Sequence, residues 1–416
     1  MKKIILMLLA AILNFGTASA AELNSETEQL ICALSATAAY SDESGDLAKR
    51  FFEVRGWKVN VFESPSTKIQ VKIHFMSYED TEKNIVKVFF ITGTEDLKDV
   101  LTDSKISPVP FKDSDEKILV HGGFKEYADA ALSEGILNFL VEYIKNHPAE
   151  KIYITGHSLG GAISMVIAAR LVDAGADMRN IKIITFGAPA VGNRDFINFY
   201  QDKINLTRIV MDSDPVDTAL KLFGYVHFGK VLKYKEYEFA THYSHSMALY
   251  FDTALRNFYD AGLNFNFQNK IDTPIYIAPV KIVKGSFKPN DEKYIKLILR
   301  DGYISRFTNV TFDAKDFTEI KKADNFSYSV REYLDAAKKS GSKFILVPLI
   351  HSKSIREAQQ PEWRILVEEM IYDSYGHLIS MNTSGMTTNS VTILGAAFFG
   401  QEFLREDREQ TLSEKN

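Results

Sequence analysis

A serine framed by two glycines is the first feature of this sequence that could do chemistry. The stretch that begins at Tyr153 reads YITGHSLGGAISM, and Ser158 stands between Gly156 and Gly160. A Gly-x-Ser-x-Gly turn between a strand and a helix is so sharp that side chains at its glycines would collide, and it presents the serine hydroxyl as a nucleophile. The flanking residues predict this strand and this helix. The main-chain N–H of Leu159 is then expected to face a developing oxyanion.

A serine is a weak nucleophile and needs a base. The chain has nine histidines, and in hydrolases with this turn the order along the chain is serine, acid, histidine. His74 and His121 precede the serine and are excluded by this order. His157 is expected to face away from the hydroxyl, while His351 and His377 lie in a later region. The remaining candidates for the base are His227, His242 and His245.

The acid is expected in the segment RIVMDSDPVDTAL, which follows an apolar strand. A carboxylate at the end of this strand would lie at the same sheet edge as Ser158. Three residues compete, namely Asp212, Asp214 and Asp217. Pro215 stiffens the loop at Asp214, and the spacing favours Asp214 without excluding the other two. Its role would be to hold the imidazole in one tautomer and to stabilise its charged form.

Strands and helices alternate over residues 86–210, which predicts an α/β domain with a largely parallel sheet covered on both faces. Three successive strands are predicted upstream, and residues 125–148 predict one long amphipathic helix. After about residue 272 the pattern predicts a smaller α+β domain. There residues 275–285, 343–350, 362–373 and 377–384 read as strands, and residues 290–303 and 329–341 as helices. Residues 390–400 fit a strand or a helix.

The first residues predict export. Lys2 and Lys3 precede an apolar run, which ends in small residues up to Ala20. This is the pattern of a cleaved signal peptide, and the run is shorter than the roughly 20 residues that span a bilayer. The expected organisation is a signal peptide (1–20), an α/β domain (21–262), an α+β domain (272–405) and a charged tail expected to fray (406–416).

Composition narrows the function classes. The 416 residues carry a net charge of −5 and include no basic run, which argues against nucleic acid as a partner. Cys32 is the only cysteine, so no intramolecular disulfide is expected. The histidines do not follow a metal-ligand spacing such as His-Glu-x-x-His. We therefore expect neither a metal nor an organic cofactor.

Several ordered stretches together resemble a known family. They read FFITGTEDLKDVLTD, VHGGFKEY, GHSLGGA, FGAPAVGN, RIVMDSDPVD and YSHSMALYF. Over roughly residues 30–259 they resemble the class 3 lipases, the fungal-lipase-like branch of the α/β-hydrolases. The resemblance implies an α/β-hydrolase fold with a mostly parallel central sheet. It does not extend to the C-terminal domain.

The resemblance also assigns roles. It implies Asp214 as the acid and His245 as the base, with His242 as the weaker candidate. It implies Thr94 as the second oxyanion donor, beside Leu159. Two positions depart from the family pattern, because Thr92 stands where arginine is usual and Asp217 where proline is common.

The implied reaction is hydrolysis of a lipid ester, an acylglycerol or a phospholipid, through an acyl-serine. In this family the stretch after the oxyanion residue forms a lid. Here Leu97, Val100 and Leu101 could form its apolar face and contact a membrane surface. One alternative is an esterase for soluble or polysaccharide-linked esters. Another is a lipid- or envelope-binding protein without turnover. The expected location is the periplasm or the exterior of the cell.

Overall fold

The computed structural model of the chain forms two compact units, Met1–Ala254 and Leu255–Asn416. The division falls within helix α10 (Met247–Asp260), not in the predicted linker that follows residue 262. The predicted signal peptide and residues 95–105 of the predicted lid lie outside the described residues. The structure describes residues 23–63, 71–79, 85–92, 106–133, 135–236, 244–265, 270–283, 285, 289–315, 317–320, 329–355 and 362–414.

The first unit is built on one seven-stranded sheet with the order β1-β2-β3-β6-β7-β8-β9. The first three strands are antiparallel, and β3 begins a parallel run that continues to β9. The predicted α/β-hydrolase arrangement with a mostly parallel sheet is therefore confirmed. The strands are β1 (Lys58–Glu63), β2 (Lys72–Glu79), β3 (Ile85–Ile91), β6 (Lys151–His157), β7 (Ile181–Phe186), β8 (Leu206–Met211) and β9 (Lys230–Tyr234).

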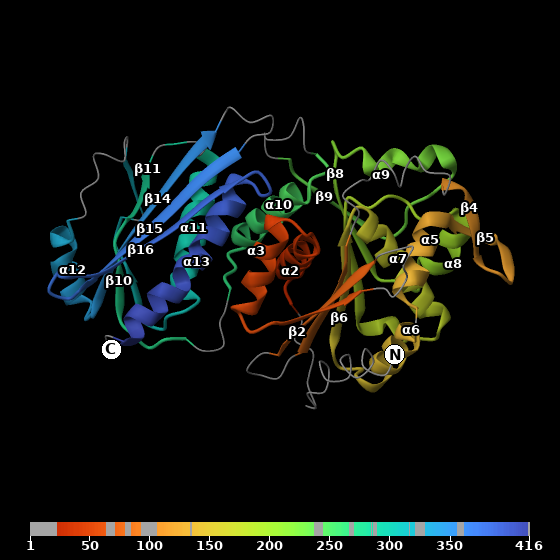
Figure 1. Cartoon of the computed structure of the whole chain (residues 1–416), viewed down its shortest axis with the longest axis horizontal. Helices are drawn as coiled ribbons and strands as arrows, with labels where there is room; N and C mark the ends of the chain where they lie inside the picture. Colours follow the sequence, from red (N-terminus) through yellow and green to blue (C-terminus); the bar gives the residue numbers. More distant parts are fainter. Residues whose placement is uncertain are drawn as a thin grey trace. The chain divides into compact units, whose positions relative to one another are not determined.

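Helices cover both faces of this sheet (Figure 1). Helices α2 (Ser25–Ala38) and α3 (Glu43–Glu53) lie on one face. The other face carries α5 (Gly122–Ala131), α6 (Ile136–Asn146), α7 (Leu159–Asp173) and α8 (Arg194–Tyr200). Apolar side chains of these helices and of the strands form the main core. Almost every residue of α7 is buried, as its apolar sequence predicts.

The prediction of a single long helix over residues 125–148 is wrong. The structure has two helices, α5 and α6, on either side of Gly135. Gly135 has φ 87°, a left-handed conformation that helices do not contain. The hairpin of β4 (Pro108–Lys112) and β5 (Asp115–His121) was also not predicted, although it leads directly into α5.

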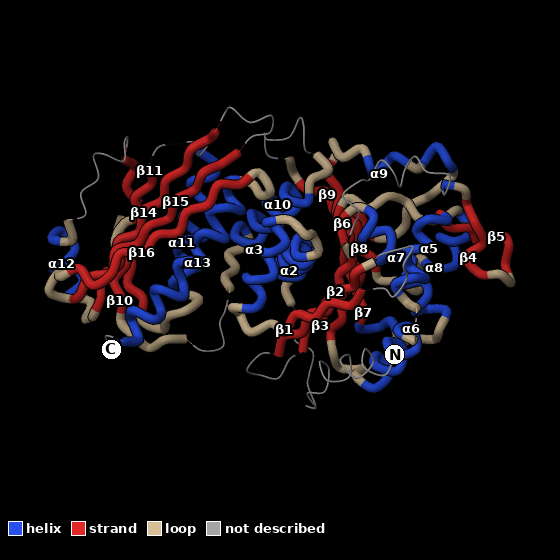
Figure 2. The backbone as a smooth tube through the Cα atoms, in the orientation of Figure 1, coloured by secondary structure: helices blue, strands red, loops and turns tan. Residues whose placement is uncertain are grey.

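The second unit has a mixed sheet centred on β14 (Phe344–Ile355) (Figure 2). On one side β14 pairs in succession with β10 (Ile275–Ile277) and β11 (Val280–Val283), which pair in turn with β12 (Val310–Phe312) and β13 (Phe317–Ile320). The strand predicted over residues 275–285 is therefore interrupted, because Pro279 lacks the N–H that a central strand needs. On the other side lie the antiparallel strands β15 (Glu362–Asp373) and β16 (Leu378–Thr388).

Helices pack on both faces of this second sheet. The apolar cluster on one face includes residues of η5 (Arg331–Tyr333) and α12 (Leu334–Lys339). The cluster on the other face includes residues of α11 (Pro289–Ile304) and α13 (Ile393–Glu414). Among the described residues of either unit, no helix is both long enough and apolar enough to cross a bilayer.

The prediction that residues 406–416 form a frayed tail is wrong as far as Glu414, because this segment is the end of α13. Arg408 is fully buried, and its Nε donates to both carboxylate oxygens of Glu369 at 3.0 Å. The hydroxyl of Tyr303 donates to the same carboxylate at 2.6 Å. Leu412 is also fully buried. The charged sequence of the helix therefore includes residues that anchor it to the sheet.

Candidate active site

Ser158 occupies the turn between β6 and α7. Its φ of 56° and ψ of −124° make it the only non-glycine residue with a positive φ in the described part of the chain. Such a conformation costs about 1–3 kcal/mol and persists only where the surrounding structure holds it. Here the N–H of Ser158 donates to the carbonyl of Phe186 at 2.9 Å, and its own carbonyl accepts from the N–H of Ala162 at 3.1 Å.

The glycines around Ser158 permit this turn. A Cβ at Gly156 would lie 2.4 Å from the carbonyl carbon of Gly160, so the main chain of Gly160 takes the space that a side chain would need. The third glycine of the motif, Gly161, is crowded as well, since its Cβ would lie 2.7 Å from the Cβ of Ala188. The crowding at this turn therefore includes Gly161, which lies one residue beyond the predicted pair.

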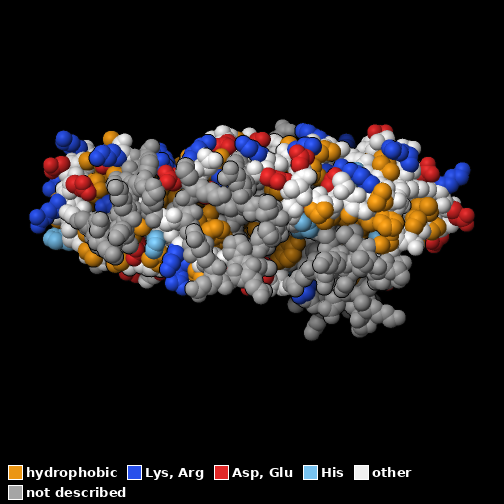
Figure 3. Space-filling model, turned by 90° about the horizontal axis from the view of Figure 1, so that it is seen from above, with side chains coloured by type: hydrophobic (Ala, Val, Ile, Leu, Met, Phe, Trp, Pro, Cys, Tyr) orange, Lys and Arg blue, Asp and Glu red, His pale blue; other side chains and the backbone are white. Residues whose placement is uncertain are grey.

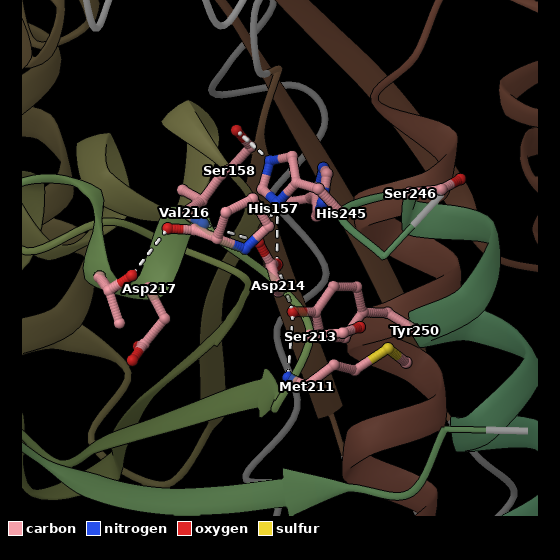
Figure 4. Close-up of polar contacts among 12 residues, drawn as sticks. His157, Ser158, Met211, Ser213, Asp214, Val216, Asp217, His245, Ser246 and Tyr250 are labelled. Carbon is pink, nitrogen blue, oxygen red and sulfur yellow. Dashed lines mark hydrogen bonds and ion pairs between the residues drawn. The ribbon is translucent and has the colours of Figure 1, made fainter. Parts of the chain in front are cut away.

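The structure brings Ser158, His245 and Asp214 together (Figure 4). The hydroxyl of Ser158 lies 2.8 Å from Nε2 of His245, and Nδ1 of His245 lies 2.8 Å and 3.0 Å from the two oxygens of Asp214. A carboxylate only accepts hydrogen bonds, so Nδ1 carries the proton and Nε2 is left to accept from Ser158. The Asp214 side chain is 0% exposed and that of His245 is 23% exposed. The imidazole therefore remains accessible while the carboxylate is shielded from water.

Two further groups hold the Asp214 carboxylate. The N–H of Val216 donates to Oδ1 at 2.9 Å, and the hydroxyl of Tyr250 donates to Oδ2 at 2.6 Å. The Tyr250 hydroxyl also accepts from the N–H of Met211 at 3.3 Å. Burial and the neighbouring Asp214 carboxylate raise the pKa of Tyr250 well above its ordinary value, so it stays a donor. Tyr250 was not predicted as a site residue, because only the folded helix α10 shows where its hydroxyl lies.

Gly187 is a second site residue that sequence reasoning missed. It has φ 53°, and a Cβ there would lie 2.5 Å from Oδ2 of Asp214 and 2.9 Å from the hydroxyl of Tyr250. It follows β7 in the stretch FGAP. The glycine therefore leaves the space in which the carboxylate meets its tyrosine donor.

His157 packs beside the base. Its ring centroid lies 4.6 Å from that of His245, and the hydroxyl of Tyr40 lies 2.5 Å from its Nδ1. Burial, followed by repulsion from His245, lowers the pKa of His157 well below its ordinary value. His157 is thus a neutral ring that is bonded to Tyr40 and packs against His245.

The competing acids have other partners. Asp212 is exposed and accepts from Lys233 at 2.7 Å. The Asp217 carboxylate binds the buried guanidinium of Arg208. His227, a candidate base, donates from Nε2 to the carbonyl of Asp217 at 2.7 Å, and burial lowers its pKa to about 4. The third candidate base, His242, lies outside the described residues.

The oxyanion donors are described in part. Leu159 is the first residue of α7, so its N–H is one of the four that lack an intrahelical acceptor. Thr94 lies outside the described residues. Thr92, which stands where the family has arginine, donates from its hydroxyl to the carbonyl of Ala39 at 3.2 Å. Nε2 of His74, on β2, lies 3.2 Å from the same hydroxyl. Thr92, which follows β3, therefore contacts both β2 and the segment that follows α2.

Within the described residues, His, Cys, Asp and Glu side chains form no group of three or more that could hold a metal ion. The contact from Ser158 through His245 to Asp214 is made by side chains of this chain alone.

Comparison with known proteins finds similarity to lipases over part of the chain. Residues 88–222 match the sequence profile described as lipase (class 3). A chloroplastic phospholipase A1, PLIP1 of Arabidopsis thaliana, is 28% identical over 169 residues, which are 39% of this chain and 26% of that protein. A lipase of Rhizomucor miehei is 30% identical over 161 residues, which are 36% of this chain and 42% of that protein. The matched part thus spans less than half of either relative.

Among solved structures, the lipase from Rhizopus microsporus var. chinensis is similar to this chain. The two are 22% identical with a TM-score of 0.44, and the similarity covers 55% of this chain and 80% of that chain. The profile match ends before His245 and Tyr250 and before the second unit begins. Residues 88–222, which carry the Ser158 turn and the Asp214 loop, thus resemble the class 3 lipases.

Proposed function

We propose that this protein is a serine carboxylic-ester hydrolase that acts on lipid esters, either acylglycerols or phospholipids. One observation carries the proposal, namely the continuous contact from the Ser158 hydroxyl through His245 to Asp214, with 2.8 Å at each step. A hydroxyl that donates to an imidazole held by a buried carboxylate is a nucleophile ready for activation.

The reaction follows from this contact. Nε2 of His245 takes the proton as Ser158 Oγ attacks the ester carbonyl carbon. The N–H of Leu159 and the predicted second donor, Thr94, stabilise the oxyanion. His245 then gives its proton to the leaving alcohol, and an acyl-serine remains. Water, activated by the same imidazole, releases the acid and restores Ser158.

The surroundings of Asp214 support the charged step. When His245 is an imidazolium, the buried carboxylate beside Nδ1 stabilises its charge in a site shielded from water. The N–H of Val216 and the hydroxyl of Tyr250 keep the carboxylate in place. Preorganised groups of this kind need no rearrangement during the reaction, and this lowers its barrier.

Exposed apolar side chains near the acid loop support a lipid substrate. Leu222 is 95% exposed and Phe223 is 56% exposed, on the turn η3 (Lys221–Phe223) that follows α9 (Val216–Ala219). Figure 3, which views the molecule from above, shows hydrophobic side chains gathered toward the right-hand end of the view, the side on which Figure 1 places α9, β4 and β5. We expect these side chains to contact aggregated lipid. The names of the relatives, lipase and phospholipase A1, fit the same substrate class.

The predicted signal peptide places the proposed reaction outside the cytoplasm, in the periplasm or beyond the cell. A lipid-ester hydrolase there would meet its substrate as membranes or droplets. This part of the proposal rests on the N-terminal sequence alone.

Labelling with a fluorophosphonate tests whether Ser158 is reactive. We expect the wild-type protein to be labelled and the Ser158→Ala variant to remain unlabelled. Ser213→Ala is the matched control, because this exposed serine lies next to Asp214 and has no role in the relay. An unlabelled wild-type protein would instead support a binding protein without turnover.

A substrate panel tests the ester class. Hydrolysis of triacylglycerols, phospholipids and short soluble esters is measured below and above the concentration at which the substrate forms aggregates. We expect the rate on lipid esters to rise when aggregates form. Turnover confined to soluble or polysaccharide-linked esters would assign the site to an esterase.

A further inference from the structure

Strand β8 carries a charged side chain in the interior of the first unit. All six of its residues are buried, and Arg208 is the charged one among them. The side chain of Arg208 is 6% exposed. Burial lowers the pKa of this guanidinium, and the neighbouring Asp217 carboxylate opposes the change, but arginine stays protonated in proteins. A charge in such a place needs a partner, because an unpaired ion in the interior is strongly destabilising.

The partner of Arg208 is Asp217, in the short helix α9. Nη2 of Arg208 donates to Oδ1 of Asp217, whose side chain is 22% exposed. Nζ of Lys221 lies 3.7 Å from the other carboxylate oxygen. His227 donates from Nε2 to the main-chain carbonyl of Asp217 at 2.7 Å. The side chain and the main chain of Asp217 are therefore both held, one from β8 and the other from the segment before β9.

Asp217 lies on the same short loop as Asp214 (Figure 4). Val216, between the two, donates its N–H to Oδ1 of Asp214 at 2.9 Å. The N–H of Asp214 itself donates to the carbonyl of Met211 at 3.1 Å. Met211 and Arg208 both belong to β8, so the loop is fastened at each end to the strand from which it emerges. Anchoring Asp217 thus also fixes the N–H that orients the Asp214 carboxylate.

We propose that Asp217 is a positioning residue for Asp214, because its ion pair with Arg208 and its hydrogen bond from His227 hold the loop that presents Asp214 to His245. The inference rests on the proposed function and deepens the account of the same site. Asp217 touches neither the nucleophile nor the base in this arrangement, and it acts through the main chain of Val216.

Stability alone does not account for an ion pair at this place. Replacing a buried ion pair by apolar residues of similar size is often neutral or stabilising, so apolar side chains would serve the fold as well. The ion pair differs in what it fixes, since neither charged group can move away without leaving the other unpaired in the interior. Apolar packing against β8 would allow the loop to shift.

The decisive variant removes both charges at once. Asp217→Ala alone leaves the Arg208 guanidinium buried without its carboxylate and destabilises the fold, whereas Arg208→Met/Asp217→Ala leaves no unpaired charge. We expect this double variant to unfold in urea at a midpoint close to that of the wild type. Its kcat should fall at least about 10-fold with KM unchanged, because a displaced acid slows the chemical step and not substrate binding. Recovery of wild-type kcat together with wild-type stability overturns the proposal.

Asp173→Ala is the matched control in the same unit. Asp173 is the last residue of α7, at the opposite end of this helix from the Ser158 turn. Its side chain is 17% exposed, pairs with Lys112 and accepts from the hydroxyl of Tyr200 at 2.8 Å. Its loss should lower the unfolding midpoint and leave kcat unchanged. If kcat fell equally in this control, loss of any ion pair in the unit would explain the effect, and the assignment of Asp217 would be wrong.

Proton NMR separates this inference from the proposed function. The Nδ1–H of His245, shared with the Asp214 carboxylate, is expected to give a strongly downfield signal, which His245→Ala identifies by its loss. We expect the signal in the wild type and in Asp173→Ala, and expect it to shift or disappear in Arg208→Met/Asp217→Ala. An unchanged signal in the double variant contradicts the role of Asp217. A wild type that shows the signal but hydrolyses no ester contradicts the proposed function instead.

Discussion

The hydroxyl of Tyr250 donates to Oδ2 of Asp214 at 2.6 Å, while Nδ1 of His245 lies 2.8 Å from the same oxygen. The tyrosine and the base therefore share one carboxylate oxygen. The tyrosine comes from the first turns of α10, and the acid follows β8. The orientation of the Asp214 carboxylate thus depends in part on Tyr250, which acts through another residue and is best described as a positioning residue.

Removing this hydroxyl should slow the chemical step. We expect Tyr250→Phe to lower kcat about 10- to 100-fold, in line with the about 1.5–3 kcal/mol of a hydrogen bond to a charged group, and to leave KM unchanged. The reason is that Asp214 loses a fixed donor while substrate contacts remain. Steady-state kinetics on one ester checks this split.

Tyr234→Phe is a matched control for that variant. The hydroxyl of Tyr234 is also buried but donates to Gln29 at 2.9 Å, so this change should affect the midpoint of unfolding and not kcat. If the two variants lowered kcat equally, the effect of Tyr250 would be one of general stability.

A methyl group at residue 187 should disable the site. In Gly187→Ala the new Cβ would collide with Oδ2 of Asp214 at 2.5 Å, so the carboxylate must move away from His245. We expect activity to fall at least about 10²-fold, because misplacement by about 1 Å has effects of this size. The comparison is Gly175→Ala, whose φ of 80° is equally left-handed but whose Cβ would meet nothing within 4 Å. Equal losses of activity in both would point to backbone strain as the cause.

Buried histidines should make the fold sensitive to acid. His121 is buried, and burial lowers its pKa to about 4 from an ordinary value of about 6.5. Between these values the unfolded chain binds the proton and the folded chain does not. The free energy of unfolding is therefore fully retained above pH 6.5 and falls as the pH drops toward 4. For one such histidine the loss between pH 7 and pH 5 is about 2 kcal/mol.

Urea unfolding at pH 7 and pH 5 measures this loss. His121 caps α5 by accepting the N–H of Phe124 at its Nδ1, and asparagine can accept the same bond without titrating. We therefore expect His121→Asn to lose less stability than the wild type over this pH range. His74, whose pKa burial also lowers to about 4, keeps part of the dependence in the variant. An unchanged pH dependence in His121→Asn would show that this histidine is not a source of it.

The exposed apolar turn after α9 should affect activity on aggregated lipid but not on soluble esters. Replacing both Leu222 and Phe223 by serine removes the exposed apolar surface without opening the core. We expect binding to phospholipid vesicles and hydrolysis of aggregated esters to fall several-fold. Turnover of a short soluble ester should stay at the wild-type rate, because neither side chain belongs to the relay. A parallel loss on both substrates would place the two residues in the ester pocket itself.

Local spacing made Ser158 predictable, because the strand, the glycines and the helix that shape its turn are contiguous. The acid was harder to predict, since three carboxylates follow the same strand and only tertiary contacts show that Asp214 faces His245. The positions of Tyr250 and Gly187 depend on contacts between elements far apart in sequence. No periodicity or motif within either segment reports such contacts.

The dependence on contacts between distant segments also explains the errors in predicting the fold. The apolar periodicity continues across Gly135, so the sequence pattern predicts one helix where the structure has α5 and α6. The end of α13 resembles a solvated tail because it is rich in charge. The partner that buries Arg408, Glu369, lies 39 residues earlier on β15. A charged residue can be predicted as buried only when its counter-ion is known.

Helix α10 begins in one unit and ends in the other. Its early turns carry Tyr250, while its later residue Arg256 is fully buried and donates to Asp291 at 2.8 Å. A truncation at the unit boundary would cut this helix between these two residues. A fragment extended to Asp260 would keep the helix but leave the guanidinium of Arg256 without its aspartate. The hydrolase-like half is therefore not a portable module, and gene fusions or domain exchanges should carry both halves together.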